Sequence, residues 1–177
     1  GPKWEGVAPE IRPEAGLLRI RAALGLFANL RPIRVFDALV DASPLKAEVV
    51  RGVDMLIVRE LTGGLYFGKP SEQRVTPEGR EAVDTLIYRE AEIVRLVELG
   101  YALAAGRRHK VTSVDKANVM ASSRLWREIT NEIAARNPEI TTEHALVDST
   151  AMKLISRPGD FDVLVMENMF GDILSDE

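Results

Sequence analysis

Residues 110–136 read KVTSVDKANVMASSRLWREITNEIAAR, and they place a short strand directly before a long helix. The pattern predicts a strand over 110–114 and a helix that Ser122 or Ser123 caps and that runs to Arg136. The same alternation recurs along the chain. Further strands are expected at 31–36, 54–58, 143–148 and 161–166, and further helices at 13–27, 91–107, 150–155 and from about Gly171. Strands that alternate with helices indicate an α/β fold.

The segment between the strand at 54–58 and the helix at 91–107 has a looser pattern. Glycines and prolines bound short extended pieces over 63–88, which predicts a protruding hairpin, or arm. Pro32 favours the start or an edge position for the strand at 31–36, because proline cannot donate to a ladder. The run DMLIV at 54–58 is of strand length and almost wholly apolar, which is typical of a buried strand.

Composition excludes several classes of site and partner. The chain is 46% hydrophobic and 28% charged, which suits one globular domain, or one domain plus a piece of another. Its net charge of −4, without a Lys/Arg-rich run, argues against a nucleic-acid partner. Cysteine is absent and the only histidines are His109 and His144, so thiolate catalysis, disulfides and Cys- or His-rich metal sites are excluded. Any bound metal would therefore have oxygen ligands.

The ends and the glycines add three expectations. No apolar run reaches the roughly 20 residues needed to cross a bilayer, so we expect no membrane partner and a cytoplasmic location. The chain starts at Gly1 without Met and stops at Glu177 within an apolar helix pattern, which predicts that both ends are cut. The G-x-G-x-x-G fingerprint of Rossmann folds is absent, and the G-x-x-x-x-G-K match at 63–69 is followed by Pro70 instead of Ser or Thr.

Two carboxylates near the C-terminus could bind a cation. Asp172 and Asp176 are four residues apart, so on a helix they share one face and repel each other unless a cation lies between them. Carboxylate oxygens are the ligands that Mg²⁺ and Mn²⁺ prefer. The alternative is a solvated helix face whose first acidic residue is favoured by the helix dipole.

Three arginines stand among apolar residues: Arg21, Arg31 and Arg59. Such an arginine is either paired internally, as Arg59 could be with the adjacent Glu60, or directed at an anion such as a carboxylate. The residues by themselves leave both alternatives open.

Lys116 and Tyr66 could transfer protons. Lys116 follows a predicted strand, and ligands gather at the carboxyl ends of strands in open α/β sheets. It could act as a base, or the adjacent Asp115 could neutralise it. Tyr66, in the glycine-flanked arm, could donate a proton or only pack.

Five segments, taken together, resemble the β-decarboxylating dehydrogenases of the isocitrate/isopropylmalate dehydrogenase family, most closely the isopropylmalate branch. Their order and separations are similar too, and the likeness runs through the whole chain. The segments are 1–4, 30–32, 59–68, 113–119 and 170–177.

The resemblance implies an α/β sheet with flanking helices and an arm, and an NAD-dependent enzyme that needs Mg²⁺ or Mn²⁺. The implied reaction oxidises a small 2-hydroxy diacid and releases CO₂; for 3-isopropylmalate the product is 4-methyl-2-oxopentanoate, in leucine biosynthesis. It also implies roles for individual residues. Arg21, Arg31 and Arg59 would bind substrate carboxylates, Tyr66 and Lys116 would be catalytic, Asn118 would contact the nicotinamide, and Asp148, Asp172 and Asp176 would hold the metal.

A homodimer with shared active sites is implied as well, because Lys116 and Asp148 of family members serve the neighbouring subunit. The arm over 63–88 resembles the segment that pairs across that interface. By the same resemblance, residues 1–28 are the edge of a cofactor-side domain, and residues 29–177 are a substrate-binding and dimerisation domain truncated at its C-terminus.

The expected substrate depends on the first helix, where Glu14, Leu17, Leu18 and Arg21 lie roughly on one face. An apolar pair there suits an isopropyl group, with about 1–3 kcal/mol of discrimination. The alternative is that both leucines are core residues. A homoisocitrate, tartrate or isocitrate dehydrogenase, or a non-catalytic dimerisation module, also remains open.

Overall fold

A computed structural model describes residues 6–8, 11 and 13–176, without the side chains of residues 14, 18 and 22. Its centre is a five-stranded sheet with the strand order β1-β2-β7-β5-β6. All neighbouring strands are parallel except β1, which runs antiparallel to β2 at one edge. The strands are β1 (Ala28–Arg34), β2 (Asp54–Glu60), β5 (Lys110–Asp115), β6 (Thr141–Leu146) and β7 (Val163–Met166).

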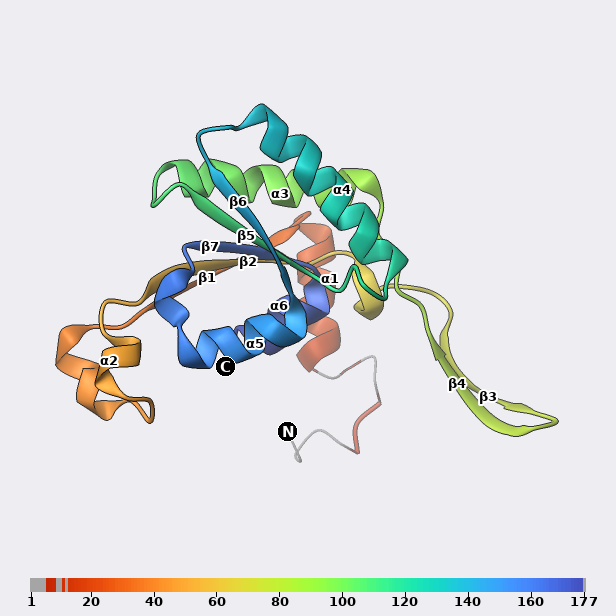
Figure 1. Cartoon of the computed structure of the whole chain (residues 1–177). Helices are drawn as coiled ribbons and strands as arrows, with labels where there is room; N and C mark the ends of the chain where they lie inside the picture. Colours follow the sequence, from red (N-terminus) through yellow and green to blue (C-terminus); the bar gives the residue numbers. More distant parts are fainter. Residues whose placement is uncertain (1–5, 9–10, 12, 177) are drawn as a thin grey trace.

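Helices cover both faces of the sheet, as Figure 1 shows. One face carries α3 (Glu90–Ala105) and α4 (Ala121–Arg136), and the other carries α5 (Val147–Ser156) and α6 (Asn168–Leu174). Neighbouring side chains of β2 point to opposite faces, so Val58 belongs to the hydrophobic cluster that includes Trp126 of α4, whereas Ile57 belongs to the cluster that includes Phe170 of α6. These layers confirm the predicted α/β fold.

The strand β1 lies at an edge of the sheet, which confirms the edge position that Pro32 favoured. Its bounds differ from those of the strand predicted at 31–36. Pro32 pairs with Leu56 of β2 in the outermost ladder of the sheet. The preceding helix, α1 (Pro13–Ala23), was expected to reach residue 27 and ends earlier. Gly25 adopts a left-handed conformation (φ +61°), and the Leu26 N–H donates to the Arg21 carbonyl at 3.0 Å. This closing turn frees the chain to become extended from Ala28.

Two predicted boundaries near the site were wrong. The residue before the first turn of α4 is Met120, without a side-chain cap, so neither Ser122 nor Ser123 caps this helix, and Ser123 is buried inside it. The strand expected over 143–148 ends at Leu146, because α5 begins immediately after it. Asp148 consequently lies in the first turn of a helix rather than at the end of a strand.

The last helix also begins earlier than predicted. The Glu167 carboxylate caps α6 by accepting a hydrogen bond from the Phe170 N–H at 3.0 Å, so the helix starts before Gly171. Asp172 lies within α6, whereas Asp176 follows its end. The two carboxylates therefore do not share a face of one helix, as the spacing had suggested.

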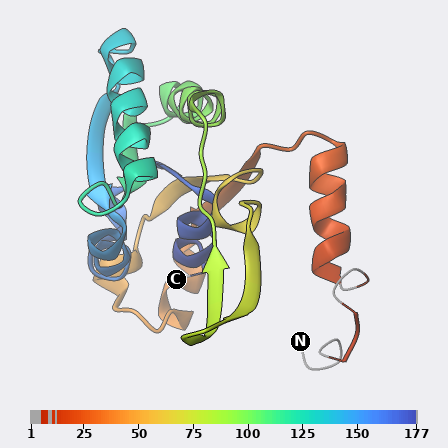
Figure 2. The same cartoon turned by 90° about the vertical axis from the view of Figure 1, so that its right-hand side faces the viewer.

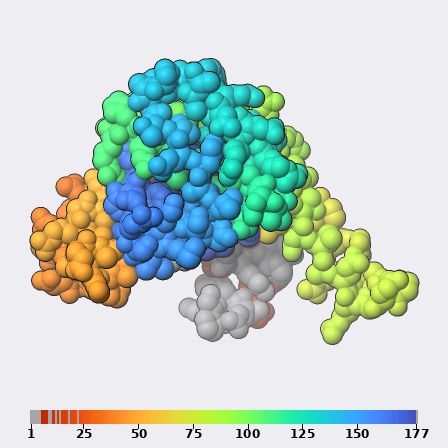
Figure 3. All heavy atoms as spheres, in the orientation of Figure 1, coloured from red at the N-terminus to blue at the C-terminus, as the bar shows by residue number. Residues whose placement is uncertain are grey.

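The predicted arm is present. It consists of β3 (Ser71–Thr76) and β4 (Gly79–Asp84), an antiparallel pair separate from the main sheet. Figures 1 and 3 show it leaving the body of the molecule. Its strands are mostly exposed, and Val75 is 83% exposed. Polar contacts join the strands, among them an Arg74–Glu81 hydrogen bond of 2.7 Å.

Two further segments project from the body. Figure 2 shows α1 standing apart from the sheet, and its Leu17 and Ile20 are 49% and 56% exposed. The 3-10 helix η3 (Asp37–Ala42) and the short α2 (Ala47–Val50) form a lobe in the connection between β1 and β2. Over the part of the chain that the structure describes, no helix is long and apolar enough to cross a membrane.

Candidate active site

Arg59 lies in β2 directly against α6 and is only 2% exposed. Its Nε and Nη2 atoms both donate to Asn168 Oδ1, at 3.1 and 2.8 Å, and Nη1 donates to Asp172 Oδ1. The close approach requires glycine at position 171, because a Cβ there would lie 2.5 Å from Arg59 Cγ. Glu60 turns to the loop that follows it instead of pairing with Arg59. Arg59 is thus directed at α6 and held in one orientation.

Arg31, on β1, lies between the side-chain carboxylates of Asp172 and Asp176. Its Nη1 is 3.0 Å from Asp176 Oδ1, and its Nη2 is 3.5 Å from Asp172 Oδ1. Nη1 also donates to Ser175 Oγ. The side chains of Asp172 and Asp176 are 36% and 76% exposed. One cationic group therefore joins two solvent-accessible carboxylates.

Tyr66 completes the surroundings of Asp172. It ends the 3-10 helix η4 (Gly64–Tyr66), and its hydroxyl donates to Asp172 Oδ2 at 2.8 Å. The guanidinium carbon of Arg59 lies 5.9 Å from the centre of the Tyr66 ring. Burial, followed by the hydrogen bond to Asp172, raises the pKa of Tyr66 above its usual value. The phenol therefore keeps its proton at neutral pH.

Arg21, in the last turn of α1, belongs to the same electrostatic environment. Burial, and then the positive charge of Arg59, lowers the pKa of Arg21, while Asp172 opposes this effect. The structure thus brings five residues of the predicted site, Arg31, Arg59, Tyr66, Asp172 and Asp176, into direct contact, and a sixth, Arg21, interacts electrostatically with three of them. We name this set the arginine–aspartate cluster.

The predicted specificity residues on α1 are only partly described. Leu17 is 49% exposed, so it does not belong to the buried core of the described part of the chain. The side chains of Glu14 and Leu18 lie outside the described residues.

Lys116 and Asp148 form a second cluster at the carboxyl ends of β5 and β6. Their Nζ and Oδ2 atoms are 2.8 Å apart, and the side chains are 24% and 63% exposed. The hydrogen bond from Lys116 lowers the pKa of Asp148 below its usual value. Asp115 does not neutralise Lys116, because its buried carboxylate receives two hydrogen bonds of 2.8 Å from Arg127.

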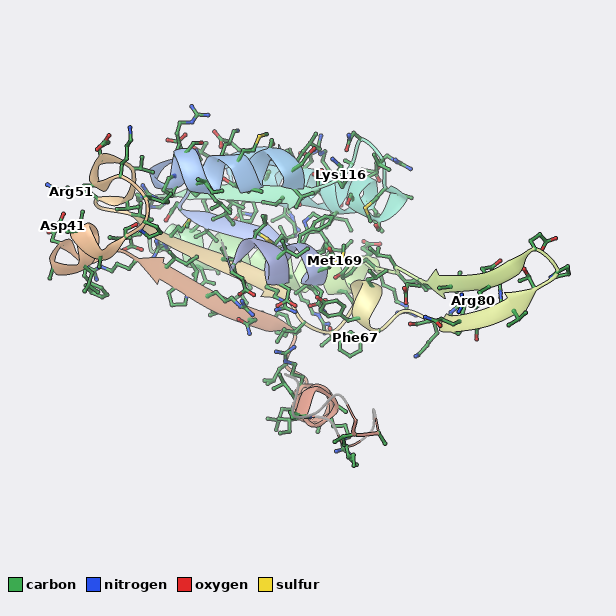
Figure 4. All side chains as sticks on the ribbon, turned by 90° about the horizontal axis from the view of Figure 1, so that it is seen from below. Asp41, Arg51, Phe67, Arg80, Lys116 and Met169 are labelled. Carbon is green, nitrogen blue, oxygen red and sulfur yellow. The ribbon has the colours of Figure 1, made fainter. Side chains whose placement is uncertain are left out.

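The two clusters are separate within one chain. Among the described residues, no three His, Asp or Glu side chains are grouped so that they could hold a metal ion. Asp148 is therefore not combined with Asp172 and Asp176 in a single subunit. Figure 4 shows Lys116, and Met169 of α6, at the end of the sheet from which the arm leaves. Asn118 is exposed in the turn after β5.

Sequence reasoning missed Asn168, which accepts both hydrogen bonds that orient Arg59. One signal was available, because Asn168 follows the last buried strand and lies near its carboxyl end. It also missed Tyr88 and Glu167, whose polar atoms meet beside Asn168. No pattern indicated those two residues, since a tyrosine before a helix is usually a packing residue.

Comparisons with known proteins give consistent matches. The family described as isocitrate/isopropylmalate dehydrogenase matches residues 1–177. The 3-isopropylmalate dehydrogenase of Geobacillus kaustophilus is 60% identical over 177 residues, which are 100% of this chain and 48% of that protein. The enzyme of the same name from Bacillus subtilis is 61% identical over 178 residues, covering 100% of this chain and 49% of that protein. The chain thus spans about half the length of these relatives.

Solved structures show the same architecture. Isocitrate dehydrogenase from Methylococcus capsulatus matches with a TM-score of 0.79 and 34% identity, over 90% of this chain and 45% of that chain. The TT0538 protein from Thermus thermophilus matches with a TM-score of 0.76 and 30% identity, over 90% of this chain and 31% of that chain.

Proposed function

The chain belongs to the isocitrate/isopropylmalate dehydrogenase family, and on this premise we propose that it forms about half of a 3-isopropylmalate dehydrogenase subunit. The complete enzyme would oxidise 3-isopropylmalate with NAD⁺ and release CO₂, giving 4-methyl-2-oxopentanoate for leucine biosynthesis in the cytoplasm. The half described here would be inactive alone.

The observation that carries this proposal is the convergence of Arg31, Arg59 and Tyr66 on Asp172. Guanidinium groups match the planar geometry of carboxylates, and a 2-hydroxy diacid has two carboxylates. Arg59 is held rigidly by Asn168, whereas Arg31 is more exposed and can exchange its aspartate partners for a substrate. Arg21, which interacts electrostatically with Arg59 and Asp172, would add a third cationic contact to the substrate.

The carboxylates of this region fit a hard divalent cation such as Mg²⁺ or Mn²⁺. Asp172 and Asp176 already share one cationic partner, Arg31, and both remain open to solvent. These two residues, with Asp148 from a second copy of the chain, would hold the ion. When bound, the ion stabilises negative charge on the substrate oxygen, and NAD⁺ accepts a hydride.

The residues of the chain itself would move the protons. Lys116 of a second copy would take the proton of the substrate hydroxyl, through water. Tyr66 would return a proton to the carbon that has lost CO₂, a role that suits a phenol with a raised pKa. Asn118, whose amide is exposed, would bind the carboxamide of the nicotinamide.

The preference for an isopropyl group would come from α1. Leu17 lies on the same helix as Arg21 and offers an apolar surface that the core of this chain does not use. An isopropyl group gains from such a contact, whereas the carboxymethyl group of isocitrate does not. Leu18 and Glu14 would line the same face.

The subunit arrangement proposed here is a homodimer with two shared sites, joined through the arm. The projecting β3–β4 pair buries little surface within its own chain, as expected for a segment that pairs with another chain. Residues 29–177 would form the substrate-binding and dimerisation domain. Residues 1–28 would belong to the edge of a cofactor-side domain, which agrees with α1 standing apart from the sheet (Figure 2).

NADH formation by the intact protein tests the function. We expect 3-isopropylmalate with Mn²⁺ to give the highest kcat/KM, and EDTA to abolish the reaction. Faster turnover of isocitrate, homoisocitrate or tartrate would overturn the choice of substrate. No NADH from any of the four would leave the chain as a binding or dimerisation module.

A further inference from the structure

The hydroxyl of Tyr88 lies where two segments of the arginine–aspartate cluster meet. Tyr88 precedes α3 at the base of the arm, yet it is only 8% exposed, and its ring packs edge-on against Trp126 with centroids 5.6 Å apart. The hydroxyl oxygen is 3.3 Å from Glu60 Oε2 and 3.2 Å from Glu167 Oε2. It also accepts a hydrogen bond of 2.9 Å from the Asn168 N–H.

The first of these segments leads from Arg59 to Tyr66. Glu60 is fully buried, and its carboxylate accepts hydrogen bonds of 2.7 Å from the Thr62 N–H and from the Gly63 N–H. The carboxylate thereby fixes the turn that carries the chain into η4. Tyr88 contacts this turn through Glu60.

The second segment is the beginning of α6. Asn168 is fully buried, and its backbone N–H is the donor to Tyr88. Its side chain accepts the two hydrogen bonds from Arg59 and donates to the Gly63 carbonyl at 3.2 Å. Any displacement of Asn168 is therefore passed directly to the guanidinium of Arg59.

Packing leaves the Tyr88 hydroxyl little freedom. A Cβ at Gly63 would lie 2.8 Å from Tyr88 Cε1, and a Cβ at Gly64 would lie 2.5 Å from Tyr88 Oη. Both positions consequently require glycine for this approach. Burial, then the charges of Glu167 and Glu60, raises the pKa of Tyr88, so the hydroxyl remains a donor.

We propose that Tyr88 is a positioning residue: its hydroxyl holds Asn168 and, through Asn168, keeps Arg59 oriented to bind a substrate carboxylate. This inference rests on the proposed function, since it assumes that Arg59 contacts the substrate. Tyr88 acts on binding and takes no part in proton transfer.

The chain offers a matched control in Tyr101. It is buried to a similar degree (3% exposed), and its hydroxyl is 2.6 Å from Thr142 Oγ1, with no contact to the arginine–aspartate cluster. Replacing either tyrosine by phenylalanine removes one hydroxyl from the interior and keeps the ring.

The test compares Tyr88→Phe and Tyr101→Phe in the intact enzyme. We expect Tyr88→Phe to raise the KM for 3-isopropylmalate about fivefold, the effect of one lost hydrogen bond, with a smaller change in kcat and an unchanged KM for NAD⁺. Tyr101→Phe should leave all three constants nearly unchanged, although both variants lower Tm. In an Arg59→Lys background, Tyr88→Phe should have no further effect on KM.

Equal kinetic constants for the two phenylalanine variants would overturn the proposal, and so would an undiminished effect in the Arg59→Lys background. If Tyr88→Phe does not fold, Glu167→Gln serves instead. Its amide competes with the Asn168 N–H for the Tyr88 oxygen and should raise the same KM, and an unchanged KM would overturn the proposal. If wild type does not turn over 3-isopropylmalate, or Arg59→Lys leaves its KM unchanged, the proposed function fails instead.

Discussion

Individual residues decide how closely α6 approaches β2, and Gly171 is the clearest case. Arg59 Cγ and Cβ lie 2.5 and 2.6 Å from the place where a side chain at position 171 would begin. The Cβ of Arg59 is fixed by the backbone of β2, and its guanidinium is bound to Asn168 and Asp172, so the side chain is restrained at both ends. The absence of a Cβ at this position is therefore a condition for the geometry of the arginine–aspartate cluster.

Gly171→Ala should destabilise the protein by about 1–3 kcal/mol through overpacking and should raise the KM for substrate. Gly159→Ala is the control, because nothing lies within 4 Å of its added Cβ, and it should be close to neutral. Urea unfolding and steady-state kinetics of the intact protein measure both effects. Equal stability of the two variants would mean that Arg59 shifts easily.

A second residue-level expectation concerns Lys116. Lys116→Met should lower kcat by about 10²–10⁴-fold with little change in KM, because a base acts only in the chemical step. Lys110 provides the control: it lies at the other end of β5 and is paired with Glu143 at 3.0 Å. Lys110→Met should retain nearly full kcat. If both variants keep it, Lys116 is an ordinary surface lysine.

The helices and strands were predictable in kind, but their ends were not. Apolar runs such as 54–58 identified strands because burial on both faces leaves a continuous hydrophobic pattern. The ends of α1, α5 and α6 depend on local hydrogen bonds that the pattern does not contain. Glu167 illustrates this point, since it caps α6 by accepting a hydrogen bond from the Phe170 N–H, a contact that no sequence pattern indicated.

The environment of Glu167 leads us to expect that the stability of the protein depends on pH. Burial raises the pKa of Glu167 above 4.5, its ordinary value, so the folded state holds this proton more tightly than the unfolded chain. The contribution of Glu167 to the free energy of unfolding is therefore complete below pH 4.5, and it is lost as pH rises through the folded-state pKa. Glu167→Gln removes this titration, so the free energy of unfolding of the variant minus that of wild type should increase with pH. Urea unfolding at a series of pH values from 4.5 upwards measures this difference in free energy. A difference that is constant or decreases with pH would contradict a raised pKa for Glu167.

The whole molecule brings together residues that no local pattern could connect. Arg31, Arg59 and Tyr66 are separated from Asp172 by 141, 113 and 106 positions in the sequence. Periodicity predicted the α/β layers, and the glycines and prolines over 63–88 predicted the arm. The convergence on Asp172 could be anticipated only from the resemblance to the family. Contacts between subunits could not be predicted from local patterns either. Within one chain the side chains of Lys116 and Asp148 pair with each other, so their proposed role in a neighbouring subunit also depends on the resemblance.

In the proposed homodimer, the arginine–aspartate cluster and the Lys116–Asp148 pair of one chain would serve two different active sites. Mixing intact subunits that carry Lys116→Met with subunits that carry Asp172→Asn tests this claim most directly. A mixed dimer would contain one site with both wild-type residues and one site with both substitutions. After random reassociation, half of the dimers are mixed, so about a quarter of wild-type activity should return although each variant alone is nearly inactive. If the mixture stays as inactive as the separate variants, the two clusters do not form a shared site.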